Sequence, residues 1–147
     1  MKHLHLIAAA AITLLASSSA VLAEECNAAG TVGTGGSASV GGTSASSVGT
    51  AGACRTDGGT TSSIGSGGSA ASIDGKAQSK THINDSGDKL KAQTKAQAVD
   101  QGTFSKSRTK TSTDGSALES TTRTMSHVPG EKPVKNTTRQ KIILPEQ

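Results

Sequence analysis

The sequence predicts a mostly disordered, low-complexity chain that follows a cleaved signal peptide. Three observations predict it: the 124 residues after position 23 include 18 each of Gly, Ser and Thr, they include 16 large apolar residues, and the chain has one Phe and no Trp or Tyr. An apolar share of about 13% lies below the roughly 20% of Leu, Ile, Val and Phe under which a chain rarely buries enough surface to offset its ordering entropy. We therefore expect no close-packed core.

Residues 1–23 are laid out as a secretory signal peptide. A basic residue precedes an apolar run of about ten residues, and Val21 and Ala23 place small residues at the −3 and −1 positions of a cleavage site. The run is half of the roughly 20 residues needed to span a bilayer, so we expect no transmembrane segment after cleavage. The sequence predicts export, either to the periplasm or as a secreted protein.

The exported part has two cysteines, Cys26 and Cys54, which an oxidising compartment most often joins as one disulfide. Closing a loop of this length removes about 3 to 4 kcal/mol of denatured-state freedom in the chain-entropy model. The separation of the two cysteines fits neither a CxxC redox motif nor a zinc site. We expect a structural disulfide, and pairing between two chains is the alternative.

Residues 24–75 are rich in Gly, Ser, Thr and Ala, with one basic and four acidic residues. Aliphatic residues recur every eight positions, at Val32, Val40 and Val48, and the same phase continues to Ile64. A short period with one aliphatic residue per repeat is typical of a β-solenoid. Gly-rich chains, however, lose much entropy on ordering, so we expect a flexible segment. A small all-β structure of solenoid-like octads is the alternative fold.

Residues 76–147 form a basic polar segment, with 13 Lys and Arg against 7 Asp and Glu, and we expect it to be largely disordered. Polar residues alternate on both sides of Asp114-Gly115, and Asp-Gly between alternating segments indicates a β-hairpin. A turn centred on this pair sets Phe104 opposite Met125. Because a lone two-stranded hairpin is marginally stable in water, we expect a transient one.

Catalytic chemistry is not expected. The exported part holds two histidines, His82 and His127, far apart in the sequence, and its carboxylates are scattered. Catalysis and metal binding need several side chains held together by a packed scaffold. The glycine-rich stretches match neither a Walker A loop nor a dinucleotide fingerprint, because the required flanking strands and helices are missing. We expect no enzymatic activity, no cofactor and no metal site.

The basic segment predicts a polyanion-binding role. One Phe cannot supply the aromatic platforms that single-strand nucleic-acid binders use, so an acidic polymer outside the cytoplasm is the expected partner. We predict an exported low-complexity structural or interaction protein, of the periplasm or extracellular matrix, that associates weakly with acidic surface polymers such as exopolysaccharide. The residues expected to make the contacts collectively are Lys76, Lys80, Lys89, Lys91, Lys95, Lys106, Arg108, Lys110 and Arg123. In its Gly, Ser and Thr content the first half is similar to small exported bacterial proteins associated with exopolysaccharide production, without a shared motif.

Two other associations stay open. A self-assembling or solenoid-like β structural module is the alternative function, in which rows of Val and Ile stack between chains. The exported part also ends with its densest apolar cluster, Ile142, Ile143 and Leu144. This cluster either docks as a short strand on the edge of a partner's sheet or is a terminal cluster without a function.

Overall fold

Long strands joined by short connections make up residues 26–87 and 89–146, the part of the chain that the computed structural model describes. The first sheet has the order β1-β2-β3 and consists of β1 (Ala28–Val40), β2 (Thr43–Thr56) and β3 (Gly59–Ser72). The second has the order β4-β5-β6-β7-β8 and consists of β4 (Lys76–Ser86), β5 (Lys89–Asp100), β6 (Thr103–Thr113), β7 (Ala117–His127) and β8 (Val134–Ile143). The expected signal peptide, residues 1–23, lies outside the described residues.

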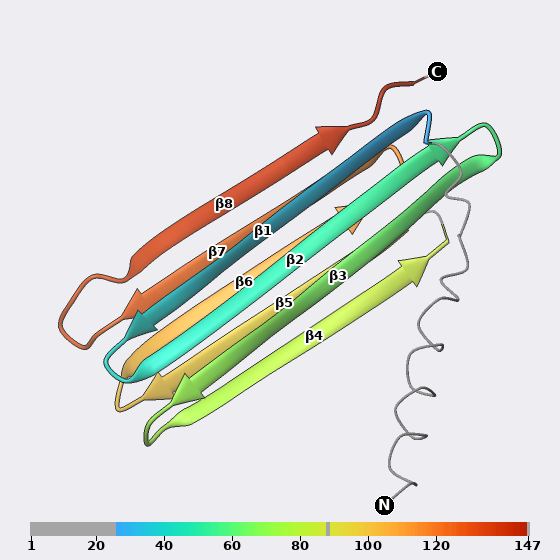
Figure 1. Cartoon of the computed structure of the whole chain (residues 1–147). Helices are drawn as coiled ribbons and strands as arrows, with labels where there is room; N and C mark the ends of the chain where they lie inside the picture. The colour runs from blue at the N-terminus through green and yellow to red at the C-terminus, as the bar shows by residue number, and fades with distance from the viewer. Residues whose placement is uncertain (1–25, 88, 147) are drawn as a thin grey trace, which may run out of the picture.

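The two sheets face each other as the layers of a sandwich (Figure 1). Every pair of neighbouring strands is antiparallel. The chain passes from the first sheet to the second at residues 73–75, which is where its composition changes from Gly-rich to basic. The sandwich is therefore neutral in one layer and basic in the other.

The expectation of a mostly disordered chain is wrong, and its all-β alternative is confirmed at the level of secondary structure. The octads do not form a solenoid, because successive strands reverse direction and aliphatic residues eight positions apart do not stack. Val32 of β1 lies opposite Ala51, whereas Val48 of β2 lies opposite Gly35. Val32 is buried in the interior and Val48 is half exposed on the outer face.

Small side chains fill the space between the sheets. The apolar part is one cluster toward one end, made of Ala28, Val32, Ala51, Ala53, Leu118 and Leu144. Most of the remaining interior is polar, and its buried hydroxyl residues are Thr34, Thr43, Ser47, Thr94, Ser105, Ser107, Thr109, Thr111, Thr113, Ser120 and Thr122. The number of large apolar residues therefore does not predict this core, because threonine methyl groups and hydrogen-bonded pairs of hydroxyl groups occupy it.

Hydroxyl groups bridge the two sheets in a continuous network. Thr34 Oγ1 of β1 lies 2.7 Å from Ser120 Oγ and 2.8 Å from Thr122 Oγ1 of β7. Ser47 Oγ of β2 lies 2.8 Å from Thr109 Oγ1 of β6. Thr109 and Thr122 join the two groups, with their hydroxyl oxygens 2.6 Å apart. Because a buried hydroxyl is costly only when it lacks a partner, this network makes a polar interior stable.

The sheets approach so closely that serine side chains reach the facing backbone. Ser107 Oγ donates to Gly36 O at 2.9 Å, and Ser120 Oγ donates to Gly49 O at 3.2 Å. Sheets with larger side chains between them pack about 10 Å apart, beyond the reach of a serine hydroxyl. Glycine permits the approach, since a Cβ added at Gly49 would overlap Thr111 Oγ1.

The predicted disulfide is confirmed within one chain. Cys26 and Cys54 are bonded, with their Cα atoms 5.4 Å apart. The bond ties Cys26, two residues ahead of β1, to Cys54 of β2, which lies opposite Ala29 of β1. A disulfide is compatible with an oxidising, exported location.

The predicted hairpin is confirmed as β6 and β7, but the predicted register is wrong by two residues. Phe104 lies opposite His127 instead of Met125, and Met125 lies opposite Lys106. The connection contains three residues, 114–116, instead of two. Three further strands extend the hairpin into a sheet, which is why it is a permanent feature of the fold.

The Asp114 carboxylate organises this turn and explains its length. Its Oδ1 accepts hydrogen bonds from Ala117 N at 2.7 Å, from Ser116 Oγ at 3.0 Å and from Ser116 N at 3.2 Å, so Ser116 becomes part of the turn. Gly115 supplies the required left-handed conformation, with φ of 83°. The hydrogen bonds from the Ala117 backbone and the Ser116 side chain lower the pKa of Asp114 from its ordinary value.

The close approach of the sheets predicts opposite effects for two glycine substitutions in the same sheet. Gly49→Ala should destabilise the protein by about 1 to 3 kcal/mol, because the new methyl group pushes the sheets apart. Gly67→Ala is the matched control: its added Cβ meets no atom within 4 Å, and it should be neutral or stabilise by up to about 1 kcal/mol. Urea unfolding of the oxidised proteins measures both. Equal effects would contradict the interior described here.

A lowered pKa in the folded state predicts an acid-sensitive contribution from Asp114. Since the folded pKa lies below the unfolded one, this contribution is present above the unfolded pKa and is lost as pH falls through the folded value. Asp114→Asn keeps an oxygen acceptor but does not titrate. The wild type should therefore be more stable than Asp114→Asn near neutral pH, and the difference should shrink toward about pH 2. Thermal melts across this range measure it, and a constant difference would contradict the prediction.

Candidate functional site

The strand register places the basic residues of the five-stranded sheet on its outer face. In β5 the even-numbered side chains point toward the other sheet, so Lys91 and Lys95 point away from it. In β6 the odd-numbered hydroxyl residues are buried, so Arg108 and Lys110 point outward. Directly paired residues lie on the same face, which extends this assignment to β4, β7 and β8. We call this surface the basic face.

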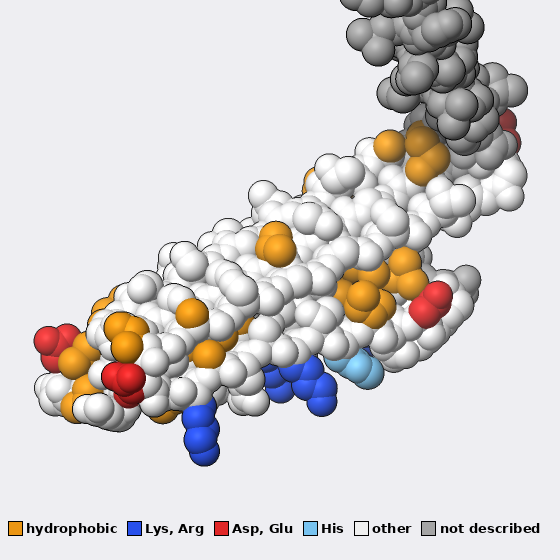
Figure 2. All heavy atoms as spheres, turned by 60° about the horizontal axis from the view of Figure 1, so that its bottom comes forward, with side chains coloured by type: hydrophobic (Ala, Val, Ile, Leu, Met, Phe, Trp, Pro, Cys, Tyr) orange, Lys and Arg blue, Asp and Glu red, His pale blue; other side chains and the backbone are white. Residues whose placement is uncertain are grey.

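All nine cations expected to contact a polyanion lie on the basic face. They are Lys76, Lys80, Lys89, Lys91, Lys95, Lys106, Arg108, Lys110 and Arg123. The structure adds Lys135, Arg139 and Lys141 of β8 to the same face. Sequence reasoning missed these three because β8 was not expected as a strand, although their odd-numbered spacing fits one. Figure 2 shows Lys and Arg side chains projecting from one side of the molecule, beside a largely uncharged surface.

Four of these cations stand in one row across four neighbouring strands. Lys80 of β4 pairs with Lys95 of β5, Lys95 pairs with Arg108 of β6, and Arg108 pairs with Arg123 of β7. Neighbouring strands lie about 4.8 Å apart, so the row spans about 14 Å with one positive charge per strand. We call these four residues the basic row. Like charges directly opposite each other destabilise a sheet, so folding alone does not account for this row.

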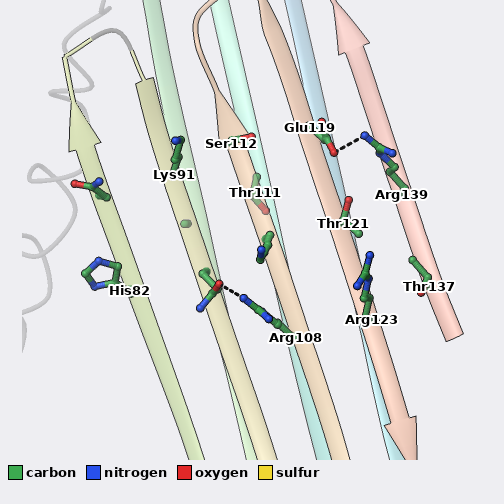
Figure 3. A pocket seen from close by; sticks show the side chains of 14 residues that line it. His82, Lys91, Arg108, Thr111, Ser112, Glu119, Thr121, Arg123, Thr137 and Arg139 are labelled. Carbon is green, nitrogen blue, oxygen red and sulfur yellow. Dashed lines mark hydrogen bonds and ion pairs between the residues drawn. The ribbon is translucent and has the colours of Figure 1, made fainter. Parts of the chain in front are cut away.

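Little negative charge compensates the basic face. Of the acidic residues in β4 to β8, Asp85 and Asp100 lie on the other side of the sheet by register, and Glu119 lies on the basic face. Glu119 Oε1 forms an ion pair with Arg139 Nη2 at 2.8 Å (Figure 3). Arg108 Nη2 donates to the uncharged Gln93 Oε1, which orients the guanidinium without neutralising it. Among the described residues no carboxylate forms an ion pair with the basic row. Its four charges are thus available to an external anion.

A hollow of about 710 Å³ lies beside the basic row on the same face (Figure 3). Its lining combines five cations, Lys91, Arg108, Lys110, Arg123 and Arg139, with polar residues that include His82, Asn84, Gln93, Ser112, Thr121 and Thr137. Amides and hydroxyls both donate and accept hydrogen bonds. The hollow can therefore bind a ligand that carries negative charge and hydroxyl groups together.

The one Phe of the chain lies at an end of the basic face and is partly buried by two neighbouring side chains. The Phe104 ring packs against His127, with ring centroids 5.1 Å apart, and Lys106 Nζ lies 4.5 Å from its centroid. It therefore provides no open platform for a base. The two histidines do not meet, since His82 lies on β4 and His127 on β7. Residues 26–87 and 89–146 contain no cluster of three or more His, Cys, Asp or Glu that could hold a metal ion.

The terminal apolar cluster contributes to the protein's own core. Leu144 is 3% exposed and belongs to the apolar cluster between the sheets, and its backbone N–H donates to Ser116 O at 2.8 Å. Ile142 is partly exposed and Ile143 is exposed on the outer side of β8. Docking of a partner through these residues stays a prediction.

Comparisons with protein families, with curated proteins and with solved structures found no match to this chain. In the part of the chain that the structure describes, no helix could cross a membrane.

Repulsion within the basic row predicts a stabilising neutral substitution. Lys95→Gln removes a cation that lies between Lys80 and Arg108, and should stabilise the free protein by about 0.5 kcal/mol at low ionic strength. The gain should shrink in salt, which screens exposed charges. Lys132→Gln, in the connection between β7 and β8, is the control and should change little. Urea unfolding at two salt concentrations measures the effect. A loss of stability in Lys95→Gln would mean that this lysine makes favourable contacts instead.

Proposed function

We propose that the protein is an exported β-sandwich module that binds an acidic extracellular polymer through its basic face. The observation that carries the proposal is the basic row of Lys80, Lys95, Arg108 and Arg123, which lacks ion-pair partners within the described chain. The sheet holds these like charges together at a cost in stability. Binding of a polyanion offsets that cost, because it brings counter-charges to all four positions.

An extended ligand fits this face better than a small anion does. Twelve cations are spread over five strands of 10 to 12 residues, so the face is about 35 Å long. A small anion would be enclosed by a few convergent groups, whereas here the charges point outward side by side. Many weak contacts along one polymer add up to useful affinity and make it sensitive to salt.

The neutral groups on the face favour an acidic polysaccharide over a nucleic acid. Proteins that bind single strands stack bases on exposed aromatic rings, and Phe104 is already covered by His127 and Lys106. The hollow instead presents amides and hydroxyls, among them Gln93 and Thr121, which pair with sugar hydroxyls. The confirmed disulfide is consistent with a protein that meets such polymers outside the cytoplasm.

The outer face of the three-stranded sheet supports a second candidate function, association between copies as a structural module. The outward strand residues of β1, β2 and β3 are Gly, Ala, Ser or Thr, apart from Val48 and Cys54. Val48 is 50% exposed and lies between Gly35 and Gly67 on the neighbouring strands. No charge on this face opposes contact with an identical face.

Sedimentation of the oxidised protein with polygalacturonate tests the proposed function. The protein should co-sediment with the polymer at low ionic strength and separate from it in salt. Lys110→Gln, which removes a cation from the hollow, should weaken binding by about two- to fivefold. Lys132→Gln removes the same charge outside the strands and should have no such effect.

Absence of salt-sensitive co-sedimentation with any acidic polysaccharide would overturn the proposal. The same experiment without polymer tests the second candidate. Concentration-dependent assembly that Val48→Lys abolishes would support association through the neutral face, and a monomer at all concentrations would remove it.

A further inference from the structure

We propose that the polymer is a linear polyuronate with a carboxylate on every sugar, and that it crosses the strands along the basic row with one sugar per strand. This inference rests on the proposed function and specifies its ligand. The observation behind it is the pairing of Lys80, Lys95, Arg108 and Arg123 in direct register, which spaces their Cα atoms by the strand separation. That separation is about 4.8 Å, close to the length of one pyranose residue in an extended chain.

The alternative path along a strand offers a poorer set of charges. Outward residues of one strand recur about every 6.8 Å, because every second residue points outward. Lys106, Arg108 and Lys110 of β6 form such a series, but Lys106 lies over the Phe104 ring. On β5 the series is broken by uncharged Gln93. The row across the strands therefore offers four consecutive cations, whereas the series along β6 offers three.

The two arginines at one end of the row suit carboxylates in particular. A guanidinium presents a planar fork of N–H donors that matches a carboxylate in a bidentate pair. Gln93 Oε1 holds one nitrogen of the Arg108 guanidinium, which limits its orientations before the ligand arrives. Arg123 lies next to Arg108 on the adjacent strand, so two consecutive uronates could each pair with one arginine.

The residues beside the basic row offer hydrogen-bonding groups for sugar hydroxyls. The next row of paired outward residues is His82, Gln93, Lys110, Thr121 and Arg139, and all five line the hollow. With the carboxylates on the basic row, the ring hydroxyls of the same sugars lie over these amide, hydroxyl and imidazole groups. A polymer with a carboxylate on every second sugar would leave every second cation of the row unpaired.

The length dependence of binding tests the one-sugar-per-strand arrangement. Oligogalacturonates of increasing length are titrated into the oxidised full chain at low ionic strength by calorimetry. Affinity should rise steeply up to the tetramer, which occupies the four cations, and only weakly beyond it. A tetragalacturonate should bind at least about tenfold more tightly than a hyaluronan octasaccharide, which carries the same four carboxylates on alternate sugars.

Two double variants separate the basic row from general charge attraction. Lys95→Gln with Arg108→Gln removes two charges from the row, and should weaken tetragalacturonate binding by at least about tenfold. Lys76→Gln with Lys89→Gln removes two charges from the same face but outside the row and the hollow, and should weaken tetragalacturonate binding by about twofold, because these two cations attract the short ligand only at a distance. Thermal melts establish that each variant is folded. The length series uses the wild-type protein alone, so it tests the inference even when a variant fails to fold.

The other outcomes would overturn the inference, and each of them leads to a different conclusion about the proposed function. Equal affinity for the two oligosaccharides, or equal loss in the two double variants, would mean a general polyanion surface, and would leave the proposed function intact. Tighter binding of single-stranded DNA than of polygalacturonate would favour the wider spacing along a strand and a nucleic acid. No binding of any polyanion at low ionic strength would overturn the inference and the proposed function together.

Discussion

The close approach of the two sheets is the constraint on which the rest of this structure depends. Ser107 and Ser120 donate hydrogen bonds to backbone carbonyls of the facing sheet, which requires a separation that only small residues allow. Glycine at position 49 admits the Thr111 side chain where any larger residue would block it. The interior is therefore thin, and it is held by hydroxyl pairs and threonine methyl groups in place of large apolar side chains. Such an interior tolerates little change in side-chain volume, but it requires very few large hydrophobic residues.

This thin interior makes the two outer faces independent of the core. Side chains alternate along the strands, so the inward positions of the central strands belong to the hydroxyl and alanine interior and the outward positions are free to vary. On the three-stranded sheet the outward positions are small and neutral, and on the five-stranded sheet many are basic. One composition thus serves two purposes: small polar residues assemble the sandwich, while the lysines and arginines in the strands of the five-stranded sheet point away from the other sheet.

The basic row shows how the fold and the proposed function meet. Lys95 lies between Lys80 and Arg108, an arrangement that sheets ordinarily avoid. The long backbone ladders and the buried hydroxyl network hold these cations in register despite their repulsion. The strand separation therefore sets the spacing of their four Cα atoms, which would vary in a disordered basic segment. Because the strands already fix the positions of these residues, binding of a polymer costs less conformational entropy than it would if a flexible basic segment had to become ordered.

Local chemistry in the sequence was enough to predict the disulfide between Cys26 and Cys54 and the hairpin around Asp114-Gly115, because both depend on residue types and short spacings. The basic composition of residues 76–147 groups the nine cations in the sequence, and the strand register places them on one face, whereas their role in binding stays a prediction. The register of the hairpin does not follow from the sequence, because the hydrogen bonds of Asp114 include Ser116 and Ala117 in the turn. Thr113 therefore pairs with Leu118 instead of Ser116, and every pair shifts by two.

The amino-acid sequence alone shows that small polar residues alternate with basic ones, that the composition changes near residue 75 and that large apolar side chains are scarce. Contacts between residues far apart in the chain turn these features into an ordered sandwich with a row of four cations. The reason is physical: burial of a threonine or serine is unfavourable alone and becomes favourable when a facing strand supplies its hydrogen-bond partner. That partner lies 60 to 88 positions away in the chain for the pairs Ser47–Ser107 and Thr34–Thr122, so no local pattern reveals it.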